Sequence, residues 1–196
     1  MRRRAEQVDE TRQRITEAAV RLHTTVGPAH TSISKVAEEA DVTRLTVYRH
    51  FEDLDALFVA CMGHWYDANP GPDVGAWSAI EPLEERARLA FNELYRWYEA
   101  RHEELYPIYR DFSAMPESAR EAASALDDAA AAAIFQDAAS DGDATRHDRL
   151  VGAVTRHLVE FWTWRSLTIE RGLESSEAAE AAVAMLIATD ATAEAS

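Results

Sequence analysis

The stretch from Thr43 to His50 carries side chains that bind phosphate groups and base edges, and it contains no acidic residue. Val47 and Phe51 are four residues apart, so they share one face of a short helix and can point inward together. The outward side chains are Arg44, Leu45, Thr46, Tyr48, Arg49 and His50. Guanidinium, hydroxyl and imidazole groups suit a helix that lies in the major groove of DNA. The stretch therefore predicts a DNA-reading helix.

A second short helix and a tight turn are needed to hold this helix in place. Ser32 can cap the earlier helix, and Thr43 can cap the later one. The chain turns between them at Asp41. The apolar positions of the earlier helix are Ile33, Val36, Ala37 and Ala40. The pattern over residues 32–51 is typical of a helix-turn-helix.

The expected roles on DNA fall into two groups. We expect Arg44, Leu45 and Thr46 to read base edges. The side chains expected to hold the sugar-phosphate backbone are Lys35, Thr43, Tyr48 and His50, and Ser32 and Arg49 complete the predicted DNA-binding set. The alternative is an ordinary short surface helix, which the capping residues at both ends make the weaker interpretation.

A longer series of motifs surrounds the two helices. It consists of Gly27, Thr31–Ile33, Val36–Ala37, Ala40–Thr43, Thr46–Phe51 and Leu57. This series, within residues 11–60, resembles the N-terminal signature of the TetR family of bacterial transcriptional regulators. The resemblance implies a three-helix DNA-binding domain with a helix-turn-helix, followed by a larger helical domain for ligand binding and dimerisation.

Three positions depart from the usual pattern of that family. Asp41 stands where the family usually has Gly, and an aspartate adopts the left-handed turn conformation only at some cost. Leu45 replaces a small residue and offers an apolar contact to a thymine methyl group. Leu54 stands where Lys is usual, so one expected phosphate contact is missing.

Charge is distributed unevenly along the 196 residues. The net charge is −15, but residues 1–52 carry nine Lys and Arg against eight Asp and Glu, so the remainder carries −16. A DNA partner is therefore compatible with the N-terminal part. A single cysteine, Cys61, excludes an internal disulfide, and no apolar run approaches the roughly 18 to 20 residues of a membrane span. We expect a cytoplasmic protein.

The composition favours long helices, because the chain has only 7 Gly and 6 Pro and no strand pattern of useful length. We expect an all-α protein of about nine helices. Residues 1–52 are the predicted DNA-binding domain, and a helix over 53–68 begins the regulatory, ligand-binding and dimerisation domain, 53–196. Pro107 predicts a bent or separate short helix over 105–112.

A second group of unusual side chains lies in the predicted regulatory domain, where rings with polar tips are more frequent than a helical core requires. The predicted ligand-binding residues are Tyr66, Tyr95, Tyr98, Tyr109, Phe112, His157, Phe161, Trp164 and Arg165. The alternative for the rings is ordinary packing in the core or between subunits. Arg165 is the candidate partner for an anion on the ligand, and its alternative is a salt bridge to Glu160 or to another subunit.

Two long helices are expected near the C-terminus, over residues 146–171 and 176–191. The first is apolar on more than one side, which favours a homodimer joined through both. Two recognition helices would then reach two half-sites of a palindromic operator.

Taken with the resemblance, these features predict a repressor that is released from DNA by a small, largely apolar, aromatic-containing molecule. No phosphate-binding loop, nucleophile elbow or zinc-protease motif is present, and the histidines are scattered. We therefore expect no catalytic residue, no cofactor and no metal. Two other classes stay open: a ligand-sensing helical protein with weak or lost DNA binding, and a helical enzyme.

Overall fold

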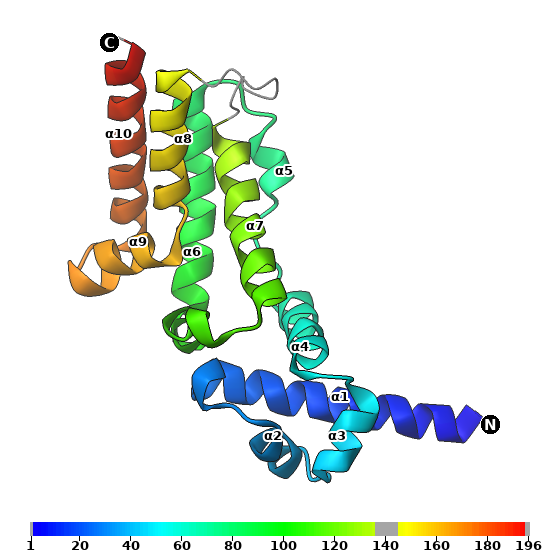
Figure 1. Cartoon of the computed structure of the whole chain (residues 1–196). Helices are drawn as coiled ribbons and strands as arrows, with labels where there is room; N and C mark the ends of the chain where they lie inside the picture. The colour runs from blue at the N-terminus through cyan, green and yellow to red at the C-terminus, as the bar shows by residue number, and fades with distance from the viewer. Residues whose placement is uncertain (1, 136–144, 195–196) are drawn as a thin grey trace. The chain divides into compact units, whose positions relative to one another are not determined.

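The computed structural model describes residues 2–135 and 145–194, and every regular element within these two ranges is helical (Figure 1). This confirms the all-α prediction. The elements are α1 (Arg2–Thr25), η1 (Pro28–His30), α2 (Ile33–Glu39), α3 (Arg44–His50), α4 (Leu54–Ala68), α5 (Val74–Trp77), α6 (Leu83–Arg110), η2 (Phe112–Ala114), α7 (Glu117–Ile134), α8 (Arg146–Leu158), α9 (Phe161–Arg165), η3 (Ser166–Glu170) and α10 (Ser175–Glu194). Of the short η segments, η1 and η2 are 3₁₀-helical and η3 is π-helical.

The chain forms two compact units, which are described separately. The first unit contains Met1–Pro70 and His102–Ala122, and the second contains Gly71–Arg101 and Ala123–Ser196. Both α6 and α7 contribute residues to each unit. These units are defined by packing, whereas the boundary expected after residue 52 divides the chain by role, into a DNA-binding and a regulatory part. That boundary stays a prediction.

The first unit is built on a core that α1, α2, α3 and α4 share. Its buried residues are Ile15, Ala18, Ala19, Ile33, Val36, Ala37, Ala40, Val47, Phe51, Leu57 and Cys61. The inward pair expected of the DNA-reading helix, Val47 and Phe51, belongs to this core. Burying each of these two side chains contributes about 1.5–3 kcal/mol, so core packing fixes which face of α3 points outward.

A turn after α1 connects the helix-turn-helix to the end of α6 within the first unit. Gly27 has φ 95°, in the region that favours glycine. Asp111 accepts a hydrogen bond from the backbone amide of Ala29 at 3.1 Å, and Arg110 donates to the carbonyl of Val26 at 2.9 Å. Arg110 also donates to Asp111 at 2.8 and 2.9 Å. The Arg110–Asp111 pair therefore holds the turn from two sides.

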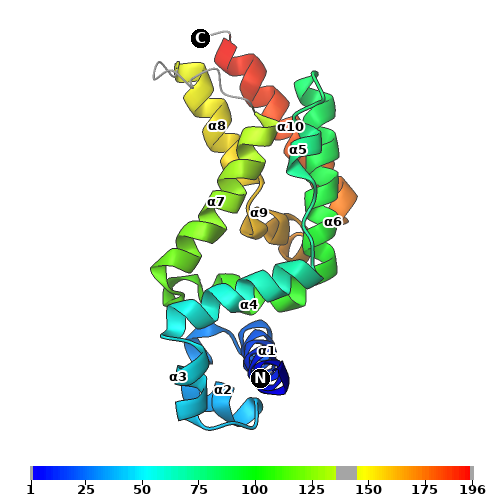
Figure 2. The same ribbon diagram turned by 90° about the vertical axis from the view of Figure 1, so that its right-hand side faces the viewer.

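The second unit is built from helices of the middle and the C-terminal part of the chain. In it, α8 and α10 pack side by side, as both views of the ribbon show (Figures 1 and 2). Ala178, Ala179 and Ala182 on α10 are fully buried, and small side chains let two helices approach closely. Thr145 and Asp148 form a reciprocal capping box that starts α8.

The single helix expected over residues 146–171 is interrupted, so that prediction is wrong. α8 ends at Leu158, and Glu160 has the extended conformation, with φ −68° and ψ 141°. α9 then begins at Phe161, and the chain changes direction between the two helices (Figure 1).

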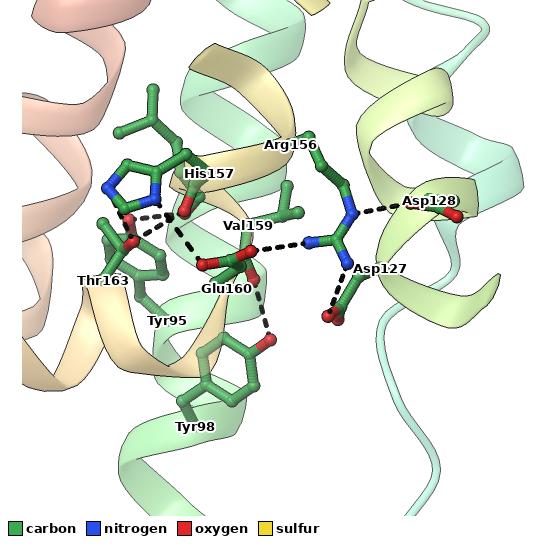
Figure 3. A network of polar contacts seen from close by, with 10 residues as sticks. Tyr95, Tyr98, Asp127, Asp128, Arg156, His157, Val159, Glu160 and Thr163 are labelled. Atoms are coloured by element: carbon green, nitrogen blue, oxygen red, sulfur yellow. Dashed lines mark hydrogen bonds and ion pairs between the residues drawn. The ribbon is translucent and has the colours of Figure 1, made fainter. Parts of the chain in front are cut away.

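Side chains from α6 explain this interruption. The hydroxyl of Tyr95 donates to the carbonyl of Leu158, and the hydroxyl of Tyr98 donates to the carbonyl of Val159, both at 2.8 Å (Figure 3). A carbonyl at a helix end needs some donor, because an unpaired buried carbonyl is costly. The two tyrosines supply those donors, so the chain can turn without losing these hydrogen bonds.

The separate short helix that was one alternative near Pro107 is not found, since α6 is helical from Leu83 to Arg110 and contains Pro107, while the other alternative, a bend at Pro107, stays a prediction. A proline inside a helix removes one amide donor and crowds the preceding turn. Leu105 and Pro107 are both buried, and their packing compensates for that local cost.

Candidate nucleic-acid interface and aromatic cluster

Both caps predicted for the helix-turn-helix are present. The Ser32 hydroxyl accepts a hydrogen bond from the amide of Lys35 at 3.3 Å, and the Thr43 hydroxyl accepts one from the amide of Thr46 at 3.1 Å. Asp41 lies between the helices with φ 52°, the left-handed conformation expected of this position. The start of α3 is therefore defined by local hydrogen bonds.

The outward face of α3 carries the side chains that were predicted to contact DNA. Leu45 is 62% exposed and Tyr48 is 49% exposed. Arg44 and Arg49 are exposed as well, whereas Thr46 and His50 are partly covered. No acidic residue lies on this helix, so its own side chains present no negative charge to a phosphate group.

The backbone-contacting candidates outside α3 have partners within the protein. Ser32 and Lys35 are exposed, but the ammonium group of Lys35 donates to the carbonyl of His30 at 2.8 Å. Thr43 is exposed and its hydroxyl lies 2.9 Å from that of Thr46. A phosphate contact from Lys35 must therefore compete with a backbone carbonyl.

Arg12 on α1 holds the end of α3, which the sequence analysis missed. Its guanidinium group donates to the carbonyl of His50 and lies over the ring of Phe51, 4.1 Å from the ring centroid. A cation at the C-terminal end of a helix is also favoured by the helix dipole. Arg12 thus fixes the orientation of the exposed face, although no local sequence pattern marks it.

The nine predicted ligand-binding residues do not gather in one unit. Tyr66, Tyr109 and Phe112 belong to the first unit, and the other six belong to the second. Four of those six are buried, and we call them the aromatic cluster, namely Tyr98, Phe161 and Trp164, whose rings contact one another, and Tyr95, whose ring contacts Phe91. Ring centroids are 5.5 Å apart for Tyr98 and Phe161, 6.0 Å for Tyr98 and Trp164, and 5.5 Å for Phe161 and Trp164.

The polar tips of the aromatic cluster are bonded within the protein. Tyr95 and Tyr98 donate to the end of α8, and the indole nitrogen of Trp164 donates to the hydroxyl of Ser175 at 3.2 Å. Burial raises the pKa of Tyr95, so its phenol stays neutral. These groups position α8 and α9. A ligand that used them as donors would have to compete with backbone carbonyls at the two tyrosines and with the Ser175 hydroxyl at Trp164.

His157 and Arg165, which were also predicted to contact a ligand, each lie beside a carboxylate. The His157 side chain is 70% exposed, and its Nδ1 is 3.5 Å from a carboxylate oxygen of Glu160. Arg165 pairs with Glu170 at 2.6 Å, not with Glu160 as one alternative had it. The guanidinium of Arg165 therefore already has a counter-ion.

Glu160 belongs instead to a network around Arg156 at the junction of α8 and α9 (Figure 3). Arg156 lies 3.1 Å from Glu160, 2.6 Å from Asp128 and 3.4 Å from Asp127. Burial raises the pKa of Asp127 to about 6, although the nearby guanidinium opposes that rise. The network ties α7 to the point where α8 ends.

A groove of about 590 Å³ lies in the first unit, along α1, α4 and the end of α6. Its lining residues are Val20, Arg21, Thr24, Thr25, His64, Trp65, Ala68, Asn69, Glu103 and Glu104. The indole nitrogen of Trp65 donates to Glu104 at 2.6 Å across it. None of the nine predicted ligand-binding residues lines this groove.

The N-terminal part of the sequence is similar to a known protein family and to two characterised regulators. Residues 15–61 match the family described as bacterial regulatory proteins, tetR family. The chain is 40% identical over 57 residues to the HTH-type transcriptional regulator AcrR of Shigella flexneri, and 35% identical over 86 residues to SrpR of Pseudomonas putida. The matched segments cover 29% and 40% of this chain and 26% and 40% of those proteins, so the chain matches less than half the length of either.

Solved structures match over most of the chain at low sequence identity. A tetR-family transcriptional regulator from Streptomyces coelicolor has a TM-score of 0.64 at 18% identity, covering 95% of this chain and 83% of that one. The regulator FadR from Bacillus subtilis, in complex with stearoyl-CoA, has a TM-score of 0.56 at 13% identity, covering 90% and 98%. At sequence identities of 18% and 13%, these matches show that the chain has a similar fold and show nothing about its ligand.

None of the helices within residues 2–135 and 145–194 combines the length and apolar composition that crossing a membrane requires. Within the same ranges, no three His, Cys, Asp or Glu side chains are grouped so as to hold a metal ion.

Proposed function

We propose that this chain, which belongs to the TetR family of bacterial regulatory proteins, is a transcriptional regulator that binds double-stranded operator DNA through α3. The observation that carries the proposal is the exposed, acid-free face of α3, held by the Thr43 cap at one end and by Arg12 at the other. Arg44, Leu45 and Thr46 read base edges, and Tyr48 and the neighbouring polar groups hold the backbone.

The regulator acts as a homodimer joined through α8 and α10. One α3 helix contacts only a few base pairs, so useful specificity calls for two half-sites of a palindrome. Leu150 on α8 and Met185 on α10 are exposed apolar side chains on this helix pair, and exposed apolar surface favours a protein contact. The interruption after Leu158 limits the α8 contribution to residues 146–158.

A small, largely apolar molecule releases the dimer from DNA, which makes the protein a repressor. The rings of the second unit offer apolar contact area for it, and the stearoyl-CoA bound to the B. subtilis protein supports an effector with an apolar chain in this fold. We place the protein in the cytoplasm, where operator DNA is found, and assign it no catalytic activity.

Binding to DNA from upstream of its own gene tests the proposal by fluorescence anisotropy at moderate salt. We expect tighter binding to one segment than to scrambled DNA of equal length. Arg44→Ala and Tyr48→Ala should each weaken it, whereas Arg171→Ala, which removes an exposed arginine from the second unit, should not.

One observation favours a second candidate. Leu54 is exposed at the first position of α4, where a lysine would contact phosphate. A ligand-binding protein that no longer recognises DNA would have this feature. Equal affinity for all tested DNA segments, unchanged by Arg44→Ala, would favour that candidate over the regulator.

A further inference from the structure

Arg86, in the first turn of α6, is a buried guanidinium group without a counter-ion among the described residues. It is 9% exposed, and its Nε atom is buried without a hydrogen-bond partner. Its Nη2 atom donates to the carbonyl of Glu81 at 3.4 Å, a long hydrogen bond. Sequence reasoning missed this residue, because its burial depends on elements far from it along the chain.

Two carboxylates of the same helix are engaged by side chains other than Arg86. Glu84 pairs with Arg88 at 2.7 Å, and Glu93 accepts a hydrogen bond from the indole of Trp77 at 2.7 Å. Within residues 2–135 and 145–194, no carboxylate forms an ion pair with Arg86. Arg156, in the same unit, differs in this respect, since it has three carboxylate neighbours.

An unpaired guanidinium in a buried position is unfavourable, because it has lost water and cannot give up its proton. Its planar donors match a carboxylate or a phosphate group, which can accept two parallel hydrogen bonds. An anion at Arg86 would supply the missing charge and a partner for the buried Nε.

We propose that Arg86 binds an anionic group, a carboxylate or a phosphate, carried by a small molecule that enters the second unit. This deepens the proposed function, on which it rests for its effect on DNA binding: the effector is an amphiphile with an apolar body and one anionic end. Arg86 takes the role that the sequence suggested for Arg165, whose guanidinium is paired with Glu170.

The chain itself contains the competing source of negative charge. Residues 136–144, outside the described part of the chain, include Asp137, Asp141 and Asp143. A variant with all three changed to asparagine separates this source from an external anion, because it removes their charges and leaves Arg86 in place.

Thermal unfolding in inorganic phosphate, compared with chloride at the same ionic strength, tests the site in the full-length protein. We expect phosphate to raise the midpoint of the wild type, and the apparent phosphate affinity to fall at least tenfold in Arg86→Met. Arg165→Met, which removes a paired guanidinium, should keep the phosphate response, as should the triple asparagine variant. Without phosphate, Arg86→Met should unfold at the same temperature as the wild type or higher.

An equal phosphate response in the wild type and in Arg86→Met would overturn the site. So would a triple asparagine variant that mimics Arg86→Met, since the partner would then be internal. If Arg86→Met fails to fold, Arg86→Lys replaces it, and a phosphate response equal to that of the wild type would count against a fork-shaped contact. Operator binding is measured separately. If the wild type responds to phosphate but does not bind operator DNA, the proposed regulatory function is rejected and the anion site stands.

Discussion

Gly27 and Asp111 lie so close together that a Cβ atom on Gly27 would overlap the Oδ2 atom of the Asp111 carboxylate. The same Cβ would stand 2.5 Å from Nη2 of Arg110. Glycine is therefore required at this position for two reasons: its φ is positive, and the Arg110–Asp111 pair occupies the space that a Cβ atom would need. This pair joins the turn after α1 to the end of α6 inside the first unit.

Replacing Gly27 with alanine should destabilise the protein by about 2 kcal/mol or more, because left-handed strain and displacement of the ion pair add together. The measurement is urea unfolding followed by circular dichroism. Gly63→Ala is the matched control, since a Cβ at that helical position meets open space, and it should be neutral or stabilise by about 0.5–1 kcal/mol. Equal midpoints for the two variants would show that the turn is not constrained.

The buried imidazole of His23 should make the stability of the protein depend on pH. Its ring lies 4.6 Å from that of Phe58, and burial lowers its pKa from 6.5 to about 4. Between these values the unfolded chain binds more protons than the folded one, so stability falls as the pH decreases. We expect a loss of about 2–3 kcal/mol between pH 7 and pH 4 from this group.

Urea titrations at several pH values test that dependence. His23→Gln should flatten the profile between pH 6.5 and pH 4, whatever its effect on stability at pH 7. His30→Gln removes an exposed imidazole and serves as the control. A His23→Gln profile parallel to that of the wild type would remove His23 as the cause.

Asp127, in the second unit, should change the stability of the protein with pH in the opposite direction from His23. Its folded-state pKa of about 6 lies above the ordinary 3.8, so the folded protein binds the proton more tightly and the charged form costs stability at neutral pH. Asp127→Asn should therefore stabilise the protein at pH 7 by about 1–3 kcal/mol, a figure that already includes the loss of the attraction to Arg156.

The advantage of Asp127→Asn should shrink as the pH falls from 6 toward 4, because the wild-type carboxyl then becomes neutral too. Asp128→Asn is the matched control, since the Asp128 side chain is exposed although it pairs with the same guanidinium. A stabilisation that is the same at pH 7 and at pH 4 would point to packing and not to charge.

The parts of this fold that follow from the sequence are those with short-range causes. Ser32 and Thr43 cap helices three residues away, and Val47 and Phe51 point inward because they are four residues apart. Such patterns need no knowledge of the rest of the chain. The helix-turn-helix and its exposed face were therefore predictable.

The parts that sequence patterns miss depend on contacts between distant residues. The interruption after Leu158 needs Tyr95, 63 residues earlier, to bond a carbonyl, and the orientation of α3 needs Arg12, 38 residues before His50. The aromatic residues are of the types that often line ligand sites, but their burial and polar contacts depend on the tertiary packing. Which of them contacts a ligand stays a prediction.

Arg12 and Arg44 should affect DNA binding in different ways, because one positions α3 and the other is on its exposed face. Arg44→Ala should cost about 1–3 kcal/mol on the best sequence and relax the preference at one base pair. Arg12→Ala should weaken all sequences by a similar factor, since it loosens the end of α3 without removing a base contact. Anisotropy titrations against an operator and its single-base variants measure both effects. Arg21→Ala, on the same helix as Arg12 but bonded to Glu39, is the control and should bind like the wild type. A changed base preference in Arg12→Ala, or an unchanged one in Arg44→Ala, would reverse these assignments.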